Sequence, residues 1–173
     1  MDAIKILIDE DKKDYKCYDI LKSLLNSNPE FKNLIEKGIE EGKLSGFNEQ
    51  LWDMIRAQNI RGINSFEDVF IDGANLGCCT SASKQLSYSF SKCYICGGVL
   101  PILAGTKNCP DGSHTWISIN SKVIDTSLML IIDESYSKNF GYIEENRYDP
   151  NRNPYYLAAK EWTNDEEIRK KHI

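Results

Sequence analysis

The sequence is poor in histidine and has neither a long apolar run nor an excess of positive charge. Only two of its 173 residues are histidines, His114 and His172. No apolar run approaches the ~18 residues of a membrane span, so no membrane partner is expected. The net charge is −5, from 21 basic and 26 acidic residues. Phosphate binding needs a basic face, so this balance argues against nucleic acid as the main partner.

The N-terminal segment also lacks the pattern of a secretion signal. Its short apolar run, Ile4 to Ile8, is flanked by Asp2 and Asp9, whereas a signal peptide has a basic start and an apolar stretch of roughly 7–15 residues. We therefore expect a cytoplasmic protein. Cytoplasmic thiols stay reduced, so catalysis or metal binding is expected of the cysteines rather than disulfides. There are six: Cys17, Cys78, Cys79, Cys93, Cys96 and Cys109.

The order of predicted elements favours one α+β domain over residues 1–173. Residues 1–70 read as helical, with helical spacing of Tyr18, Leu21, Leu24 and Leu25. Asn28-Pro29 has the pattern of a helix start, Gly42 that of a helix stop, and a third helix fits residues 48–59.

A catalytic core of helix and sheet is predicted over residues 71–132. A helix is expected over residues 79–91, and strands over 94–103, 114–119 and 122–132. The last two strands are joined by a tight turn at Asn120-Ser121. Residues 133–173 are expected to form a C-terminal extension that packs on the core, with a final helix from Thr163.

Three short stretches suggest thiolate catalysis when they are read together. Cys78 and Cys79 stand where a loop enters the predicted helix, and the unpaired N–H groups of a helix start favour the thiolate. His114 begins a strand and Asp125 lies in the next strand. Because His172 is penultimate and expected to fray, His114 is the candidate base. A thiol, an imidazole and a carboxylate are the groups that nucleophilic acyl chemistry needs.

The predicted hairpin explains how the imidazole and the carboxylate could meet. A two-residue turn at 120–121 places residue 118 opposite 123 and residue 116 opposite 125. His114 and Asp125 then become diagonal neighbours, which is close enough for a carboxylate to hold an imidazole.

These motifs resemble the transglutaminase-like and papain-like cysteine enzyme superfamily over roughly residues 73–130. The similar features are Gly77-Cys78-Cys79 at a helix start, His114-Thr115-Trp116 at a strand start, and Asp125 in a following strand. The resemblance implies a cysteine-bearing helix packed on an antiparallel sheet. It also implies a hydrolase or acyltransferase that acts on amide, peptide or thioester bonds of a peptide, protein or small acyl substrate.

The resemblance assigns roles to single residues as well. It implies Cys79 as nucleophile, His114 as general base and Asp125 as orienting acid, with no metal or cofactor. The backbone N–H of Cys79 would form half of an oxyanion hole and Asn75 is a candidate for the rest. Cys78 and Trp116 are further candidates for substrate or oxyanion contacts, with Trp116 expected in the core or the pocket wall. Two departures are that Cys78 fills the middle position and that Thr80 replaces the aromatic residue that often follows the nucleophile. Cys78 therefore stays open as an alternative nucleophile.

Two other functions fit parts of the same sequence. Cys93, Cys96, Cys109 and His114 have the spacing C-x2-C-x12-C-x4-H, which could hold a tetrahedral zinc ion in a binding or interaction module. Such a site would consume the proposed base. The chain could also be a catalytically inactive member of the same fold that is used for binding.

Overall fold

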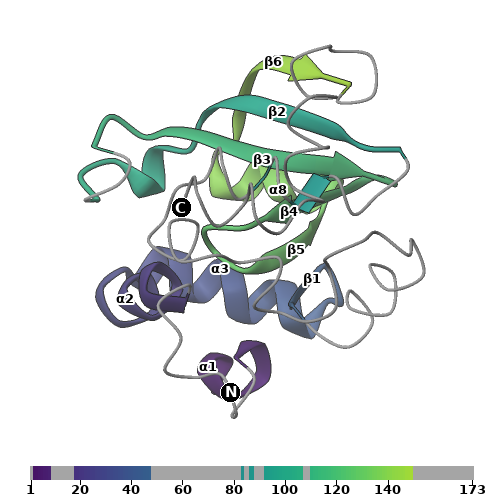
Figure 1. The fold of residues 1–173 in the computed structure, drawn as a ribbon. Helices are drawn as coiled ribbons and strands as arrows, with labels where there is room; N and C mark the ends of the chain where they lie inside the picture. Colours follow the sequence, from purple (N-terminus) through teal and green to yellow (C-terminus); the bar gives the residue numbers. More distant parts are fainter. Residues whose placement is uncertain are drawn as a thin grey trace, which may run out of the picture.

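The protein has a mixed α+β fold built on one antiparallel sheet (Figure 1). The computed structural model describes residues 2–8, 18–47, 83, 86–87, 92–106 and 110–149. The six strands have the spatial order β1-β5-β4-β3-β2-β6, and every neighbouring pair is antiparallel. The expected α+β class is therefore confirmed at this level.

The elements follow the chain with helices first and most strands later. The helices whose full bounds lie in the described ranges are α1 (Ala3–Leu7), α2 (Asp19–Ser27), α3 (Pro29–Glu40) and α8 (Glu134–Ser137), with 3-10 turns η3 (Pro101–Leu103) and η4 (Lys138–Phe140). The strands are β1 (Leu44–Gly46), β2 (Tyr94–Val99), β3 (Ser113–Ile119), β4 (Lys122–Asp125), β5 (Leu130–Asp133) and β6 (Ile143–Tyr148). None of the helices in these ranges is long and apolar enough to span a bilayer.

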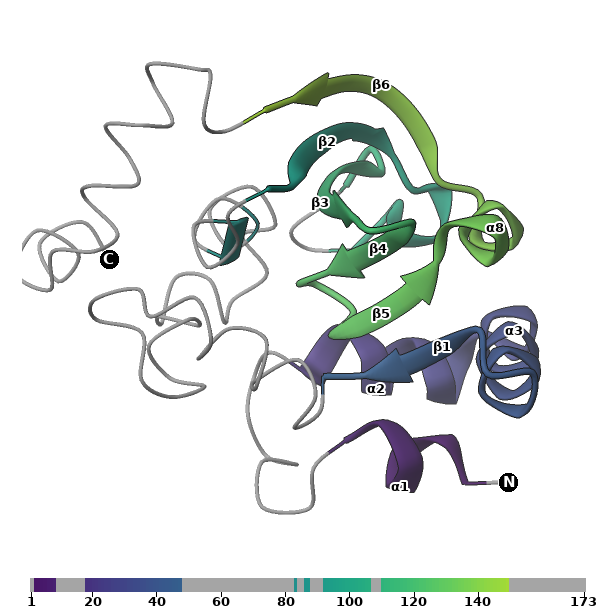
Figure 2. The same cartoon turned by 90° about the vertical axis from the view of Figure 1, so that its right-hand side faces the viewer.

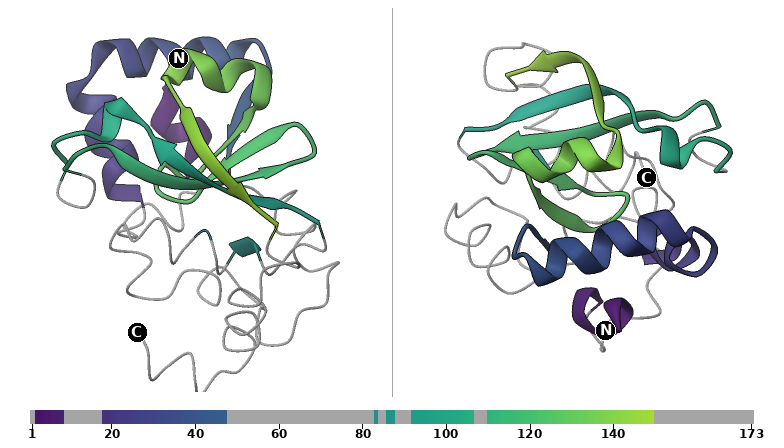
Figure 3. Two further views of the ribbon diagram at one scale, coloured as in Figure 1. Left: turned by 90° about the horizontal axis from the view of Figure 1, so that it is seen from above. Right: turned by 180° about the vertical axis from the view of Figure 1, so that it is seen from behind.

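The N-terminal helices gather at the β1–β5 side of the sheet, whereas β2 and β6 lie at the other side (Figure 2). The predicted start of α3 is confirmed, because the Asn28 side chain accepts a hydrogen bond from the Phe31 N–H at 3.0 Å. Seen from behind, α3 runs below α8 (Figure 3), and it contacts β1 and η4. Phe31 meets Phe140 of η4 edge to face, with ring centroids 5.9 Å apart. This contact joins α3 to η4, the turn that comes shortly before β6.

The β3–β4 hairpin has the predicted turn and register. Asn120 and Ser121 have φ of 50° and 61°, and two positive φ values are typical of a type I′ turn. Ser118 pairs with Val123 and Ile117 with Ile124. Continuing this register places position 116 opposite position 125, as expected from the sequence.

Other strand predictions were wrong. Residues 122–132 form two strands, because the chain turns back after Asp125 and Met129 adopts φ of 55°. The strand that was expected to reach Leu103 ends at Val99, since Pro101 starts η3 and cannot donate to a ladder. Strand β1 lies in the part expected to be helical, and β6 was not predicted.

Part of the prediction lies outside the described residues. This applies to the third helix over 48–59, the loop with Asn75, Cys78 and Cys79, and the final helix from Thr163. The central helix over 79–91 is described at Ser83, Leu86 and Ser87, which are helical and buried. Their spacing of three and four residues is that of one helix face.

Candidate functional site

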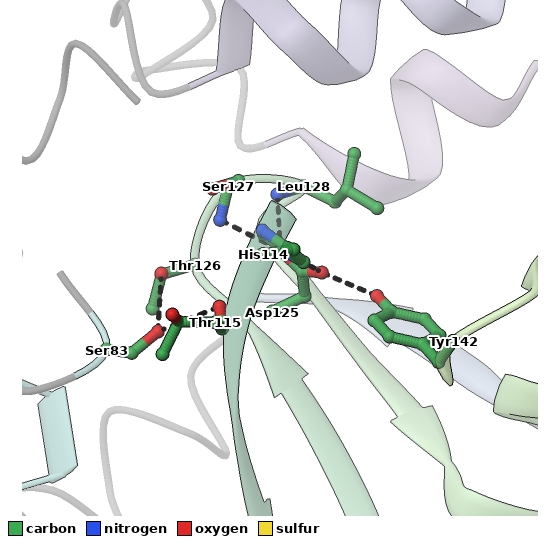
Figure 4. A network of polar contacts seen from close by, with 8 residues as sticks. All are labelled: Ser83, His114, Thr115, Asp125, Thr126, Ser127, Leu128 and Tyr142. Atoms are coloured by element: carbon green, nitrogen blue, oxygen red, sulfur yellow. Dashed lines mark hydrogen bonds and ion pairs between the residues drawn. The ribbon is translucent and has the colours of Figure 1, made fainter. Parts of the chain in front are cut away.

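His114 and Asp125 form a buried pair between neighbouring strands (Figure 4). Their Nε2 and Oδ2 atoms are 2.7 Å apart, and both side chains are 0% exposed. His114 comes from β3 and Asp125 ends β4. The diagonal contact that the hairpin register predicted is therefore present in the structure.

The Asp125 carboxylate is also held by the backbone that follows it. Its Oδ1 atom accepts hydrogen bonds from the N–H groups of Ser127 and Leu128, each at 2.9 Å. These bonds close a turn directly after β4, which is why the strand ends there. The carboxylate thus serves two purposes, because it terminates a strand and holds an imidazole.

Electrostatics keep Asp125 ionised. Burial alone would raise its pKa, but the charge and hydrogen bond of His114, with hydrogen bonds from Tyr142 and the Leu128 N–H, hold the pKa of this carboxyl below its usual range. An ionised carboxylate only accepts hydrogen bonds, so Nε2 of His114 must be the donor. Proton exchange between the ring and a reacting group would therefore use Nδ1, which is also buried.

Tyr142 belongs to this site, although the sequence analysis assigned it no role. Its hydroxyl donates to Oδ2 of Asp125 at 2.5 Å (Figure 4). Burial, and then the charge and hydrogen bond of Asp125, raise the pKa of Tyr142 well above its usual value. The sequence signal that could have indicated Tyr142 is the glycine directly before it. Gly141 has φ of 88° and turns the chain from η4 toward β6.

Trp116 packs against the site rather than joining its polar contacts. It is 3% exposed, and its ring meets that of Tyr142 edge to face with centroids 5.0 Å apart. The His114 ring lies 5.9 Å from it, centroid to centroid. The expectation of a core or wall position fits these contacts.

The Ser83 hydroxyl joins the central helical segment to β3 and to the turn that follows β4. The Ser83 hydroxyl donates to the Thr115 carbonyl at 3.2 Å and lies 3.4 Å from the Thr126 hydroxyl (Figure 4). Thr115 directly follows His114, and Thr126 directly follows Asp125. The segment is therefore anchored beside the pair. Its predicted nucleophile Cys79, like Cys78 and Asn75, lies outside the described residues.

Cys93 and Cys96 are the thiols of the zinc alternative that the structure describes, and both are buried. Cys93 donates to the Ser87 carbonyl at 3.5 Å. Burial, and then the hydrogen bond and charge of Glu144, raise the pKa of Cys96 to about 12. No group of three or more Cys, His, Asp or Glu side chains that could hold a metal occurs in the described ranges. Cys109, the third ligand of that alternative, lies outside them.

Comparisons of the chain with protein-family models, curated proteins and solved structures find no match.

Proposed function

We propose that the protein catalyses acyl chemistry through a thiolate. Cys79 is the nucleophile, His114 the general base and Asp125 the group that orients the base. The observation that carries this proposal is the buried contact of 2.7 Å between Nε2 of His114 and Oδ2 of Asp125. A core that only needed stability would gain little from a buried ionisable pair, whereas a general base needs such a partner to set its tautomer.

The position of Ser83 supports Cys79 as the nucleophile. Cys79 lies four residues before Ser83, which corresponds to about one turn of the helix predicted over residues 79–91. Ser83 contacts the residue after His114 and lies beside the residue after Asp125. A helix start one turn away would bring its N–H groups and the thiol to the same end of the two strands. Cys78 is the alternative one position earlier.

The reaction follows from these roles. The Cys79 thiol passes its proton to Nδ1 of His114, and the sulfur bonds to the carbonyl carbon of an amide, ester or thioester. The carbonyl oxygen carries the resulting negative charge, which the Cys79 N–H and Asn75 would stabilise. As the intermediate collapses, the leaving group departs with the proton from His114, and the acyl group remains on sulfur. Water or an amine then attacks the thioester, gives its proton to His114, and releases the thiolate.

Iodoacetamide labelling as a function of pH tests this proposal. A thiol with a pKa near 8.5 is almost wholly protonated at pH 6. We expect Cys79 to be labelled faster than Cys93 and Cys96 at pH 6, with peptide mapping to locate the label. His114→Ala should lower the Cys79 rate by on the order of 10- to 100-fold.

His172→Ala is the matched control, because it removes the other histidine of the chain. Its labelling rate should equal that of the parent protein. Preferential labelling of Cys78 would identify Cys78, rather than Cys79, as the nucleophile. Equal and slow labelling of every cysteine would contradict the proposal and indicate an inactive member of the fold.

A further inference from the structure

The carboxylate of Asp125 has two side-chain donors on one oxygen. Nε2 of His114 lies 2.7 Å and the Tyr142 hydroxyl 2.5 Å from the same Oδ2 atom. The other oxygen, Oδ1, is bound by two backbone N–H groups. The Tyr142 hydroxyl therefore acts directly on the atom that contacts the imidazole.

We infer that Tyr142 is a positioning residue of the proposed reaction, which holds the Asp125 carboxylate in place and tempers its pull on His114. This inference rests on the proposed function. The hydroxyl and the imidazole both donate to Oδ2. Each hydrogen bond draws on the negative charge of that oxygen and therefore weakens the other hydrogen bond. A positioning residue of this kind sets how readily the base holds and releases its proton.

The fold places the Tyr142 ring independently of its hydroxyl. Gly141, with φ of 88°, turns the chain after η4 into β6. Strand β6 then passes so close to Gly98 of β2 that any Cβ there would collide with the Ile143 carbonyl. The Tyr142 ring packs edge to face on Trp116 at 5.0 Å. The ring can therefore stay in place when the hydroxyl is removed.

The surroundings of His114 define what a titration would report. Among the residues that the structure describes, the titratable groups that contact it are Asp125 from β4 and Tyr142 from the segment before β6, while Trp116 on its own strand is uncharged. Loss of the Tyr142 hydroxyl leaves Oδ2 with more negative charge for His114. The protonated imidazole should then be favoured.

NMR titration of ring-labelled histidine tests the inference. Only two histidines give signals, and His172 serves as an internal reference. Tyr142→Phe should move the His114 midpoint to higher pH by roughly 0.5–1 unit. Tyr136→Phe is the matched control, since it removes a buried-ring hydroxyl that donates to the Leu34 carbonyl at 2.6 Å, far along the chain from the pair. It should leave the midpoint unchanged.

A second measurement applies if Tyr142→Phe does not fold. Uniform replacement of tyrosine by 3-fluorotyrosine makes the hydroxyl a stronger donor and keeps the ring, so the His114 midpoint should move to lower pH. An unchanged midpoint in both experiments, or an equal shift in Tyr136→Phe, would overturn the inference. The titration needs neither Cys79 nor a substrate. Its failure is therefore separate from a failure of the proposed reaction, which would appear in the labelling of Cys79.

Discussion

Strand β4 carries one ion pair at each end, and the two pairs differ in their surroundings rather than in their length. At its start, Lys122 Nζ lies 2.7 Å from Asp133 Oδ1, and these side chains are 51% and 28% exposed. At its end, Asp125 Oδ2 lies 2.7 Å from His114 Nε2, and both side chains are 0% exposed. Lys43 adds a further charge to the exposed pair at 4.0 Å.

The comparison shows that burial, rather than distance, decides what an ion pair does. The exposed pair keeps much of its hydration, and such pairs contribute about 0–1 kcal/mol to stability. The buried pair has given up its hydration, so each member depends on the other and on the surrounding donors. Because burial removes the hydration of both groups, such a pair adds little to the stability of a sheet. Its value lies in a defined tautomer and a defined ring orientation, which are the requirements of a general base.

The largest expected difference between the two pairs is in stability. Asp125→Ala removes the partner of a buried imidazole and leaves two backbone N–H groups and the Tyr142 hydroxyl without their acceptor. We expect the free energy of unfolding to fall by about 3–5 kcal/mol. Asp133→Ala, the matched change at the other end, should cost about 0–1 kcal/mol. Urea unfolding followed by circular dichroism measures both values, and equal costs would show that the buried pair has no special role in the fold.

A smaller difference is expected in the dependence of stability on pH. The pKa of Asp125 is lowered in the folded protein. The contribution of this carboxylate to the free energy of unfolding is therefore fully present above the ordinary carboxyl pKa of about 3.9. It is lost as the pH falls below that value toward the pKa of the folded state. The stability advantage of the parent protein over Asp125→Asn should therefore shrink between pH 5 and pH 2.5. The same comparison with Asp133→Asn is the control. A constant advantage of Asp125 across this range would contradict the lowered pKa.

The β3–β4 hairpin shows what could be predicted from local sequence. Asn120-Ser121 is a turn signal between two apolar stretches, and a two-residue turn determines the register of the whole hairpin. The contact between His114 and Asp125 follows from that register without any knowledge of distant parts of the chain. The start of α3 at Asn28-Pro29 is predictable for the same reason, because capping is local.

The features that were missed depend on contacts between distant parts of the chain. Strand β1 has three residues and exists because it pairs with β5, about 85 positions later. The role of Tyr142 depends on the approach of β6 to Gly98, which no periodicity encodes. The break between β4 and β5 was missed because residues 122–132 were read as one strand, whereas the Asp125 carboxylate caps a turn directly after β4.

The central claim is that Cys79 and His114 act together, and the most direct test is to cross-link their side chains. The bifunctional reagent 1,3-dibromoacetone alkylates a thiolate and then an imidazole within the reach of its three carbons. Treatment of the folded protein at pH 6, with digestion and mass spectrometry, should yield a Cys79–His114 cross-link that is absent from unfolded protein. A cross-link of His114 to Cys93 or Cys96 instead, or single alkylation of Cys79 without a cross-link, would contradict the account.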